Sequence, residues 1–220
     1  MRGDDFFRQI ANKPPFTRMH PRLAAFFKEY LANEKVISFY GHKVVNTHFP
    51  PYPSPSFENL IEHFSQIGDV RVRRLFSVTL AVTNRCGYRC WHCYNAGRSQ
   101  DDLPLSLWRK VISELQNMNT VMVTLSGGEP LLRDDLAEII GLFDGRTTLK
   151  LNTTGVSLTE GRAAVLKERG LFALGVSLDS HIPETHDALR GTKGAFRNAL
   201  RALRFAAKCR LYPYVIAVAT

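Results

Sequence analysis

Residues 77–95 read SVTLAVTNRCGYRCWHCYN, an apolar strand-like run followed at once by three closely spaced cysteines. Cys86, Cys90 and Cys93 have the spacing C-x3-C-x2-C. Three thiolates can hold three irons of a [4Fe–4S] cube and leave the fourth iron open for a small molecule, whereas a fully ligated cluster mainly carries electrons. Because barrel folds build their active sites on loops that follow strands, the sequence predicts an open-site cluster here.

Two other uses of the cysteines remain open from the residues alone. A zinc site needs four nitrogen or sulfur ligands, and the fourth would have to be His92 or the distant Cys209. A plain electron-transfer cluster would need a fourth cysteine near the triplet. Since three of the chain's four cysteines lie within one short loop, ligand thiolates in a reducing compartment are favoured over disulfides.

Downstream of residue 75 the chain alternates apolar strand-like runs with amphipathic helical segments. Strands are expected at 77–82, 120–125, 148–151, 172–178 and 214–218, and helices at about 106–115, 135–143, 159–170 and 195–208. This alternation predicts an α/β fold whose sheet is parallel and whose crossovers are right-handed. Each polar or glycine-rich motif directly follows a strand, so the motifs should meet at the carboxyl-end rim of the sheet.

The first 74 residues follow another pattern. We expect an irregular arm over 1–19, a helix over 21–33 and a small hairpin over 36–45. The proline-rich run 49–55 is typical of a stiff extended linker, and Ser56 is expected to cap the next helix.

The predicted organisation is a small α+β extension with a proline-rich linker over 1–74 and an α/β domain over 75–220. Because the chain stops at Thr220, close behind a predicted strand, we expect a partial protein with an incomplete sheet.

The net charge of +9 is concentrated downstream of the extension. Residues 71–98 contain six arginines and no carboxylate, which suits either nucleic acid or an anionic cluster and ligand. No nucleic-acid recognition module accompanies the charge, so nucleic acid is the weaker interpretation. No apolar run approaches the roughly 20 residues needed to cross a bilayer, and the N-terminus lacks a secretory signal. We therefore expect a cytoplasmic protein.

Four motifs at successive strand ends together resemble the radical S-adenosylmethionine (SAM) enzymes. They are the cysteine triplet, GGEP at 127–130, NTTG at 152–155 and SLD at 177–179. The resemblance covers roughly residues 75–220. The later run PETHDALRGTKGAFRNAL, residues 183–200, is similar to the branch that contains SPASM-type peptide-modifying enzymes, cofactor-maturation enzymes and the molybdenum-cofactor GTP cyclase.

The resemblance implies a partial (βα)6 TIM-like barrel in which the three cysteines ligate the cluster. The amino and carboxylate groups of SAM would chelate the open iron, and a one-electron donor such as flavodoxin or ferredoxin would trigger cleavage. The products would be methionine and a 5′-deoxyadenosyl radical, which abstracts hydrogen from a substrate. That step needs no general acid, base or nucleophile from the protein, so we expect no catalytic side chain of that kind.

The resemblance also places the SAM contacts on the strand-end loops, with His92 standing where the family commonly has an aromatic residue near the adenine. Paired glycines allow close approach to a ligand, Glu129 can accept hydrogen bonds from an ammonium group, and Arg190 can pair with a carboxylate. Asn152 and Ser177 suit a ribose or a carboxylate, or equally a strand-end cap. The expected cofactor-binding residues are His92, Gly127, Gly128, Glu129, Pro130, Asn152, Ser177 and Arg190. His181 and His186 are expected to be solvated loop histidines.

The substrate implied by the resemblance is a peptide or a small molecule, in peptide modification or cofactor maturation. The competing function class is a non-catalytic zinc or iron–sulfur module that binds nucleic acid or protein through a basic face. Such a face is present on the last predicted helix, although a solvated outer face explains it more simply. It consists of Arg197, Arg201, Arg204 and Lys208.

Overall fold

The computed structural model describes residues 1–14, 16–66, 71 and 73–218. Thr220, at which the sequence suggested a truncated chain, lies outside the described residues. The chain divides into two compact units. The first comprises Met1–Ser77, Glu114–Met122 and Gly145–Thr148, and the second comprises Val78–Ser113, Val123–Asp144 and Leu149–Thr220.

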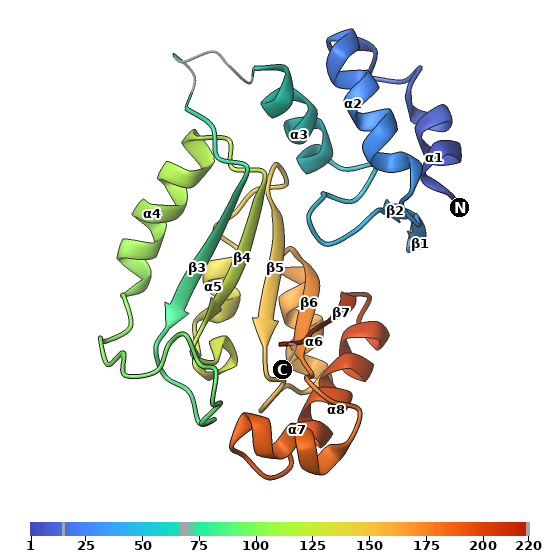
Figure 1. The fold of residues 1–220 in the computed structure, drawn as a ribbon. Coiled ribbons are helices and arrows are strands. Elements are labelled where there is room, and N and C mark those ends of the chain that lie inside the picture. The colour runs from blue at the N-terminus through green and yellow to red at the C-terminus, as the bar shows by residue number, and fades with distance from the viewer. Residues whose placement is uncertain (15, 67–70, 72, 219–220) are drawn as a thin grey trace. The chain divides into compact units, whose positions relative to one another are not determined.

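A five-stranded parallel sheet organises the second unit, and its strand order follows the chain, β3-β4-β5-β6-β7 (Figure 1). Each strand therefore lies beside its predecessor, as in a barrel wall and unlike a doubly wound sheet. The strands are β3 (Ser77–Thr83), β4 (Met122–Gly127), β5 (Thr148–Thr153), β6 (Leu171–Ser177) and β7 (Tyr212–Ile216).

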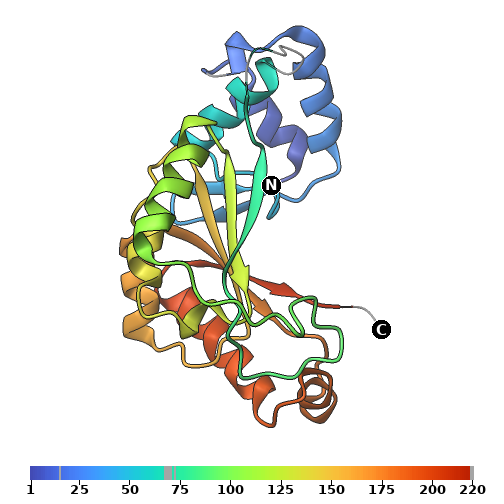
Figure 2. The same ribbon diagram turned by 90° about the vertical axis from the view of Figure 1, so that its left-hand side faces the viewer.

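Helices connect the strands and lie along one face of the sheet, as Figure 2 shows for α4, α5 and α6. One-sided coverage is the arrangement of a barrel wall, so the predicted partial TIM-like α/β fold is confirmed. The helices are α4 (Leu105–Asn117), α5 (Leu136–Ile140), α6 (Glu160–Glu168), α7 (Pro183–Arg190) and α8 (Ala195–Lys208), with a short 3-10 turn η2 at Pro130–Leu132.

The core of this unit consists of aliphatic side chains from the strands and from the inner sides of the helices. In α8 the inner side carries four fully buried alanines, whose small side chains let the helix backbone approach its neighbours closely. The alanines are Ala195, Ala199, Ala202 and Ala206. The predicted basic face of α8 is exposed on the other side.

The first unit holds α1 (Gly3–Ile10), η1 (Phe16–Arg18), α2 (Pro21–Ala32), β1 (Ile37–Phe39), β2 (His42–Val44) and α3 (Pro55–Ser65). The predicted hairpin and the 21–33 helix are confirmed, but the expectation of an irregular arm over 1–19 is wrong for α1. Phe6 and Ile10, four residues apart, bury one stripe of α1, while Asp4 and Asp5 occupy its first turn, where the helix dipole favours carboxylates.

The proline-rich run 49–55 is packed rather than free. Phe49, Pro50 and Pro51 are buried, and the Tyr52 and Lys43 backbones exchange hydrogen bonds of 2.9 and 2.6 Å. The helix that follows is capped by Ser54, whose hydroxyl accepts from Phe57 N. The prediction of Ser56 as the cap is therefore wrong.

Helix α7 was not predicted, and it forms because its ends suit a helix. Pro183 stands in the first turn, where its missing N–H costs nothing, and Gly191 follows the last residue with φ 60°. This short helix determines much of the site geometry below.

Among the described residues, no helix is long and apolar enough to span a bilayer.

A core truncation tests the packing of the sheet. Leu174 in β6 is 0% exposed, so Leu174→Ala should lower the free energy of unfolding by about 2–5 kcal/mol through lost burial and a residual cavity. The measurement is chemical denaturation followed by circular dichroism. Val165 on α6 is 43% exposed, and Val165→Ala is the matched control, with an expected change of about 0.5 kcal/mol or less. Equal losses in both variants would contradict the assigned core.

Candidate functional site

A cavity of about 230 Å3 lies where the strands of the sheet end. Nine of the eleven predicted site residues line it, namely Cys86, Cys90, His92, Cys93, Gly127, Gly128, Asn152, Ser177 and Arg190. Glu129 and Pro130 are not among the lining residues. The cavity is completed by residues that the sequence analysis did not single out: Tyr94, Ser126, Thr153, Thr154, Ile216 and Val218.

The three cysteines of the loop are free thiols on this one cavity. Cys90 and Cys93 are half-buried and Cys86 is exposed at its edge, where partial desolvation still raises the pKa of the thiol. Among the described residues, no three His, Cys, Asp or Glu side chains are placed to hold one metal ion together.

Backbone contacts join the end of β3 and the cysteine loop that follows it, residues 84–95, to the turn after β4. Gly128 N donates to Thr83 O at 2.7 Å, and Glu129 N donates to Arg85 O at 2.8 Å. A Cβ atom on Gly127 would lie 2.2 Å from Thr83 O, and one on Gly128 would lie 2.3 Å from Arg85 O. The two glycines were expected to admit a ligand. The backbone of Thr83 at the end of β3 and of Arg85 in the cysteine loop lies so close because neither glycine has a side chain. Both glycines also line the cavity, so their contact with a ligand stays a prediction.

Tyr94, directly after the third cysteine, makes a second connection to the same turn. Its hydroxyl donates to Gly127 O at 3.0 Å and lies 3.0 Å from Ser126 Oγ. Sequence reasoning gave no signal for this contact, because it depends on the path of the loop across 33 residues of chain.

The Glu129 carboxylate is fully buried and is engaged by the protein itself. Oε1 accepts from Leu131 N at 3.0 Å and from the Thr153 hydroxyl, and Oε2 accepts from Thr154 N at 2.7 Å and from the Thr154 hydroxyl. Burial raises the pKa of this carboxyl, and the four hydrogen bonds oppose that effect. The side chain that the sequence assigned to a ligand ammonium therefore ties the turn after β4 to the end of β5.

Asn152 at the end of β5 is oriented by Tyr214 from β7. The Tyr214 hydroxyl donates to Asn152 Oδ1 at 2.8 Å, which leaves the amide N–H groups as the donors that Asn152 can offer. Burial raises the pKa of Tyr214 to about 12, so the phenol stays protonated. Gly175 makes room for this ring, since a Cβ there would lie 2.5 Å from Tyr214 Cζ.

Arg190 and Asp179 form a buried ion pair beside Cys90. The Arg190 Nε–Asp179 Oδ2 and Nη2–Oδ1 distances are both 2.7 Å, and the side chains are 7% and 1% exposed. Arg190 Nη1 lies 3.8 Å from Cys90 Sγ. The expectation of a solvated His186 is wrong, because this residue is 1% exposed in α7 and its Nδ1 accepts from Asp179 N at 3.1 Å.

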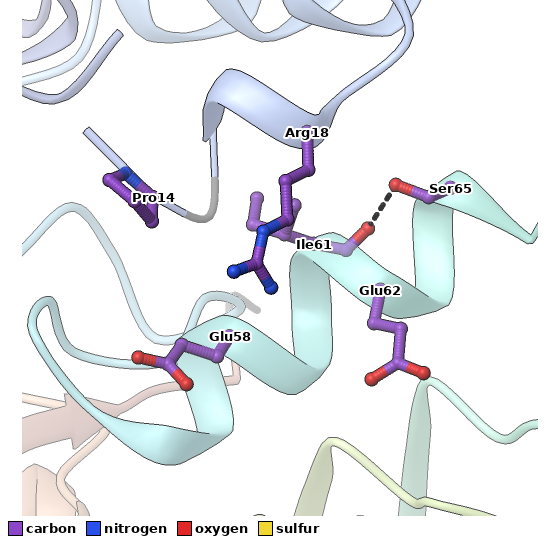
Figure 3. A pocket seen from close by; sticks show the side chains of 6 residues that line it. All are labelled: Pro14, Arg18, Glu58, Ile61, Glu62 and Ser65. Carbon is purple, nitrogen blue, oxygen red and sulfur yellow. Dashed lines mark hydrogen bonds between the residues drawn. The ribbon is translucent and has the colours of Figure 1, made fainter. Parts of the chain in front are cut away.

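A second hollow, in the first unit, contains none of the predicted site residues. It has a volume of about 320 Å3 and is lined by Pro14, Arg18, Glu58, Ile61, Glu62 and Ser65. Figure 3 shows the Arg18 side chain reaching toward α3 between the two glutamates. Ser65 Oγ donates back to Ile61 O at 2.8 Å within the helix. The positive charge of Arg18 offsets part of the negative charge of Glu58 and Glu62. None of the sequence motifs lies in this hollow.

The chain matches the family described as the radical SAM superfamily over residues 80–218. Among curated proteins, Fe-coproporphyrin III synthase of Methanosarcina barkeri is 36% identical over 126 residues, which cover 56% of this chain and 31% of that protein. Pre-heme d1 synthase of Dinoroseobacter shibae is 35% identical over 127 residues, with the same coverage of 56% and 31%. The chain thus spans about a third of the length of these relatives.

Solved structures support the fold. Streptococcus suis SuiB bound to S-adenosylmethionine aligns with a TM-score of 0.60 at 16% identity, covering 74% of this chain and 39% of that one. The anSMEcpe structure with bound AdoMet and the Cp18Cys peptide aligns with a TM-score of 0.56 at 19% identity, covering 66% and 43%.

The Glu129 contacts generate a stability prediction. Glu129→Ala would leave the hydroxyl and N–H donors of two threonines unsatisfied, so we expect a loss of about 3 kcal/mol in the free energy of unfolding. Glu129→Gln keeps the size and one acceptor oxygen and should lose about 1–2 kcal/mol. Glu138→Gln at an exposed position of α5 is the control. Chemical denaturation measures all three, and an unchanged Glu129→Ala variant would contradict the assigned role.

The same carboxyl predicts a pH dependence. Its pKa in the folded protein is raised above the ordinary value of 4.5, so the folded state binds the proton more tightly than the unfolded state does. The stability that this provides is present below pH 4.5 and is lost as the pH rises through the folded pKa. The unfolding free energy of the unmodified protein should therefore fall relative to Glu129→Gln as the pH rises across that window. A constant difference would contradict the raised pKa.

Proposed function

The chain belongs to the radical SAM superfamily, and on that basis we propose that it binds a [4Fe–4S] cluster through Cys86, Cys90 and Cys93 and cleaves SAM reductively beside it. The observation that carries this proposal is the joint placement of three free thiols and the loops after the strands on one cavity. An enzyme of this class, rather than a binding module, is also what the two synthase relatives indicate.

The cavity residues fit such a cluster. Thiolates are the ligands that iron–sulfur clusters prefer, and the three free thiols line one cavity, as three ligands of one cluster must. Arg190 Nη1 is close to Cys90 Sγ, so a cation is at hand for a ligand thiolate. When bound, the cluster and SAM would supply one-electron cleavage of the sulfonium to methionine and a 5′-deoxyadenosyl radical that abstracts hydrogen from the substrate.

The chain's own residues would bind and orient the SAM molecule. The backbone of Gly127 and Gly128 lines the cavity, and Asn152 offers amide N–H donors to a ribose or carboxylate oxygen. Ser177 at the end of β6 provides a hydroxyl beside them. His92 also lines the cavity, and its buried Nδ1 has no hydrogen-bond partner among the described residues, so it is the group we assign to the adenine.

The surroundings of the cysteine loop favour an acidic one-electron donor such as flavodoxin or ferredoxin. Arg85 pairs with Asp102 at 2.8 Å, while Arg89 in the loop and Arg98 just after it are exposed. Complementary charge speeds the encounter of two proteins. Free thiols suit a reducing compartment, so we place the protein in the cytoplasm.

For the substrate we favour a cofactor precursor over a peptide. The two relatives at 35–36% identity are named as synthases of an iron porphyrin and of a heme d1 precursor. The peptide-bound structure, at 19% identity, supports only the fold.

Cysteine variants test the proposal directly. Anaerobic reconstitution with iron and sulfide should give a cluster whose EPR spectrum changes on adding SAM, with reductive release of 5′-deoxyadenosine. Alanine at Cys86, Cys90 or Cys93 should abolish both signals, since each removes one of three ligands. Cys209, which donates to Glu160 O at 3.4 Å, supplies the control, and Cys209→Ala should retain both. A purified protein that holds one tightly bound zinc and releases no 5′-deoxyadenosine would contradict the proposal and support a non-catalytic zinc module.

Tyr214→Phe tests the assignment of Asn152. Loss of one hydrogen bond, worth about 0.5–1.5 kcal/mol, frees the amide to rotate and should weaken SAM binding by about 2–10-fold without changing the iron content. Calorimetric titration of the reconstituted protein gives the dissociation constant. Tyr40→Phe, at an exposed ring outside the cavity, is the control. Equal SAM affinity in both variants would contradict the assignment of Asn152 to the SAM site.

A further inference from the structure

We infer that the ion pair of Arg190 and Asp179 tunes the reduction potential of the cluster through the Cys90 thiolate. This inference rests on the proposed function, because it assumes that Cys90 ligates a cluster. Arg190 was expected to bind the carboxylate of SAM, but its contacts in the structure point to the cysteine loop.

The guanidinium is fixed by the carboxylate in a two-point arrangement. Nη2 of Arg190 donates to Asp179 Oδ1 at 2.7 Å, and Nε lies 2.7 Å from Oδ2 as an ion-pair contact without a hydrogen bond. One charge-assisted hydrogen bond and the ion pair together restrain the guanidinium. The remaining nitrogen, Nη1, is the one that lies 3.8 Å from Cys90 Sγ. Two of the three guanidinium nitrogens therefore face Asp179, and the third faces the Cys90 sulfur.

Asp179 is itself held on two sides. Its backbone N–H donates to His186 Nδ1 at 3.1 Å, and its Oδ1 accepts from Val218 N at 3.1 Å. The carboxylate thus connects the end of β6, helix α7 and the segment after β7, and it gives Arg190 little freedom to turn toward another anion.

The backbone of α7 fixes Cys90 from both sides. Arg89 N donates to Arg190 O at 3.2 Å, and Trp91 N donates to Leu189 O at 3.4 Å. Gly191 permits this contact, because a Cβ there would lie 2.4 Å from Arg89 O. Arg190 therefore holds the Cys90 segment with its carbonyl and contacts the Cys90 sulfur with its side chain.

The two charges must act in opposite directions on a cluster. Hydrogen bonds to sulfur ligands and the net charge nearby are established determinants of cluster potential. A cation at Cys90 favours the reduced cluster, which carries one more electron, and the carboxylate behind it weakens that effect. Because both side chains are almost fully buried, water screens neither charge strongly. Removing the cation should lower the potential, whereas neutralising the anion should raise it.

The test is an EPR-monitored redox titration of the reconstituted protein without SAM, with SAM affinity measured in parallel. We expect Arg190→Gln to shift the reduced-to-oxidised ratio at least tenfold toward the oxidised cluster, about 59 mV for one electron. Asp179→Asn should shift the potential in the positive direction, and Arg190→Lys, which keeps the charge, should change it less than Arg190→Gln. Arg201→Gln, which removes an exposed charge from α8, is the matched control and should leave the potential unchanged.

Opposite shifts in Arg190→Gln and Asp179→Asn support the inference, since a merely structural role would not produce them. Shifts of the same sign, or potentials equal to that of Arg201→Gln, would overturn it. So would a weakened SAM affinity in Arg190→Gln at an unchanged potential, which would assign Arg190 to the ligand. If Arg190→Gln fails to hold a cluster, the sign of the Asp179→Asn shift decides. Failure of the unmodified protein to take up any cluster would instead contradict the proposed function.

Discussion

The contact between the cysteine loop and the turn after β4 is the constraint from which the rest of the site follows. Two backbone hydrogen bonds join the segments, and a Cβ atom at 127 or 128 would collide with the carbonyl oxygen of Thr83, at the end of β3, or of Arg85 in the loop. Because these hydrogen bonds join backbone groups, they fix the start of the loop independently of side-chain rotamers. Tyr94 adds a contact at the far end of the cysteine triplet, so both ends of the triplet are held by one turn.

Two buried carboxylates, those of Glu129 and Asp179, hold the elements around the cysteine loop in different ways. Glu129 is satisfied by hydroxyl and N–H donors, which carry no charge and hold neighbouring strand ends together. Asp179 is satisfied mainly by a cation that also contacts a cysteine. A buried charge without such partners would be costly. The first arrangement therefore serves to position the turn, while the second places a charge where it can influence the chemistry of the loop.

Much of the architecture could be predicted from the sequence, because hydrophobic periodicity and strand-end motifs are local signals. Long-range contacts could not. Two of the residues that bind the Glu129 carboxylate, Thr153 and Thr154, lie 24 and 25 residues downstream and meet it only through the register of neighbouring strands. Helix α7 was missed since its sequence has few apolar residues, and its ends give the stronger signal. The packing of the proline-rich run was not predicted, because composition does not reveal that Phe49 is buried.

We propose that the three cysteines hold a cluster whose open iron binds SAM. Electron–nuclear double resonance of the reduced, reconstituted protein tests it most directly, with SAM carrying an isotopic nitrogen label in its amino group. We expect a hyperfine coupling between the cluster and that nitrogen, which disappears when SAM is omitted. A cluster that forms normally but shows no coupling to the labelled nitrogen would contradict it.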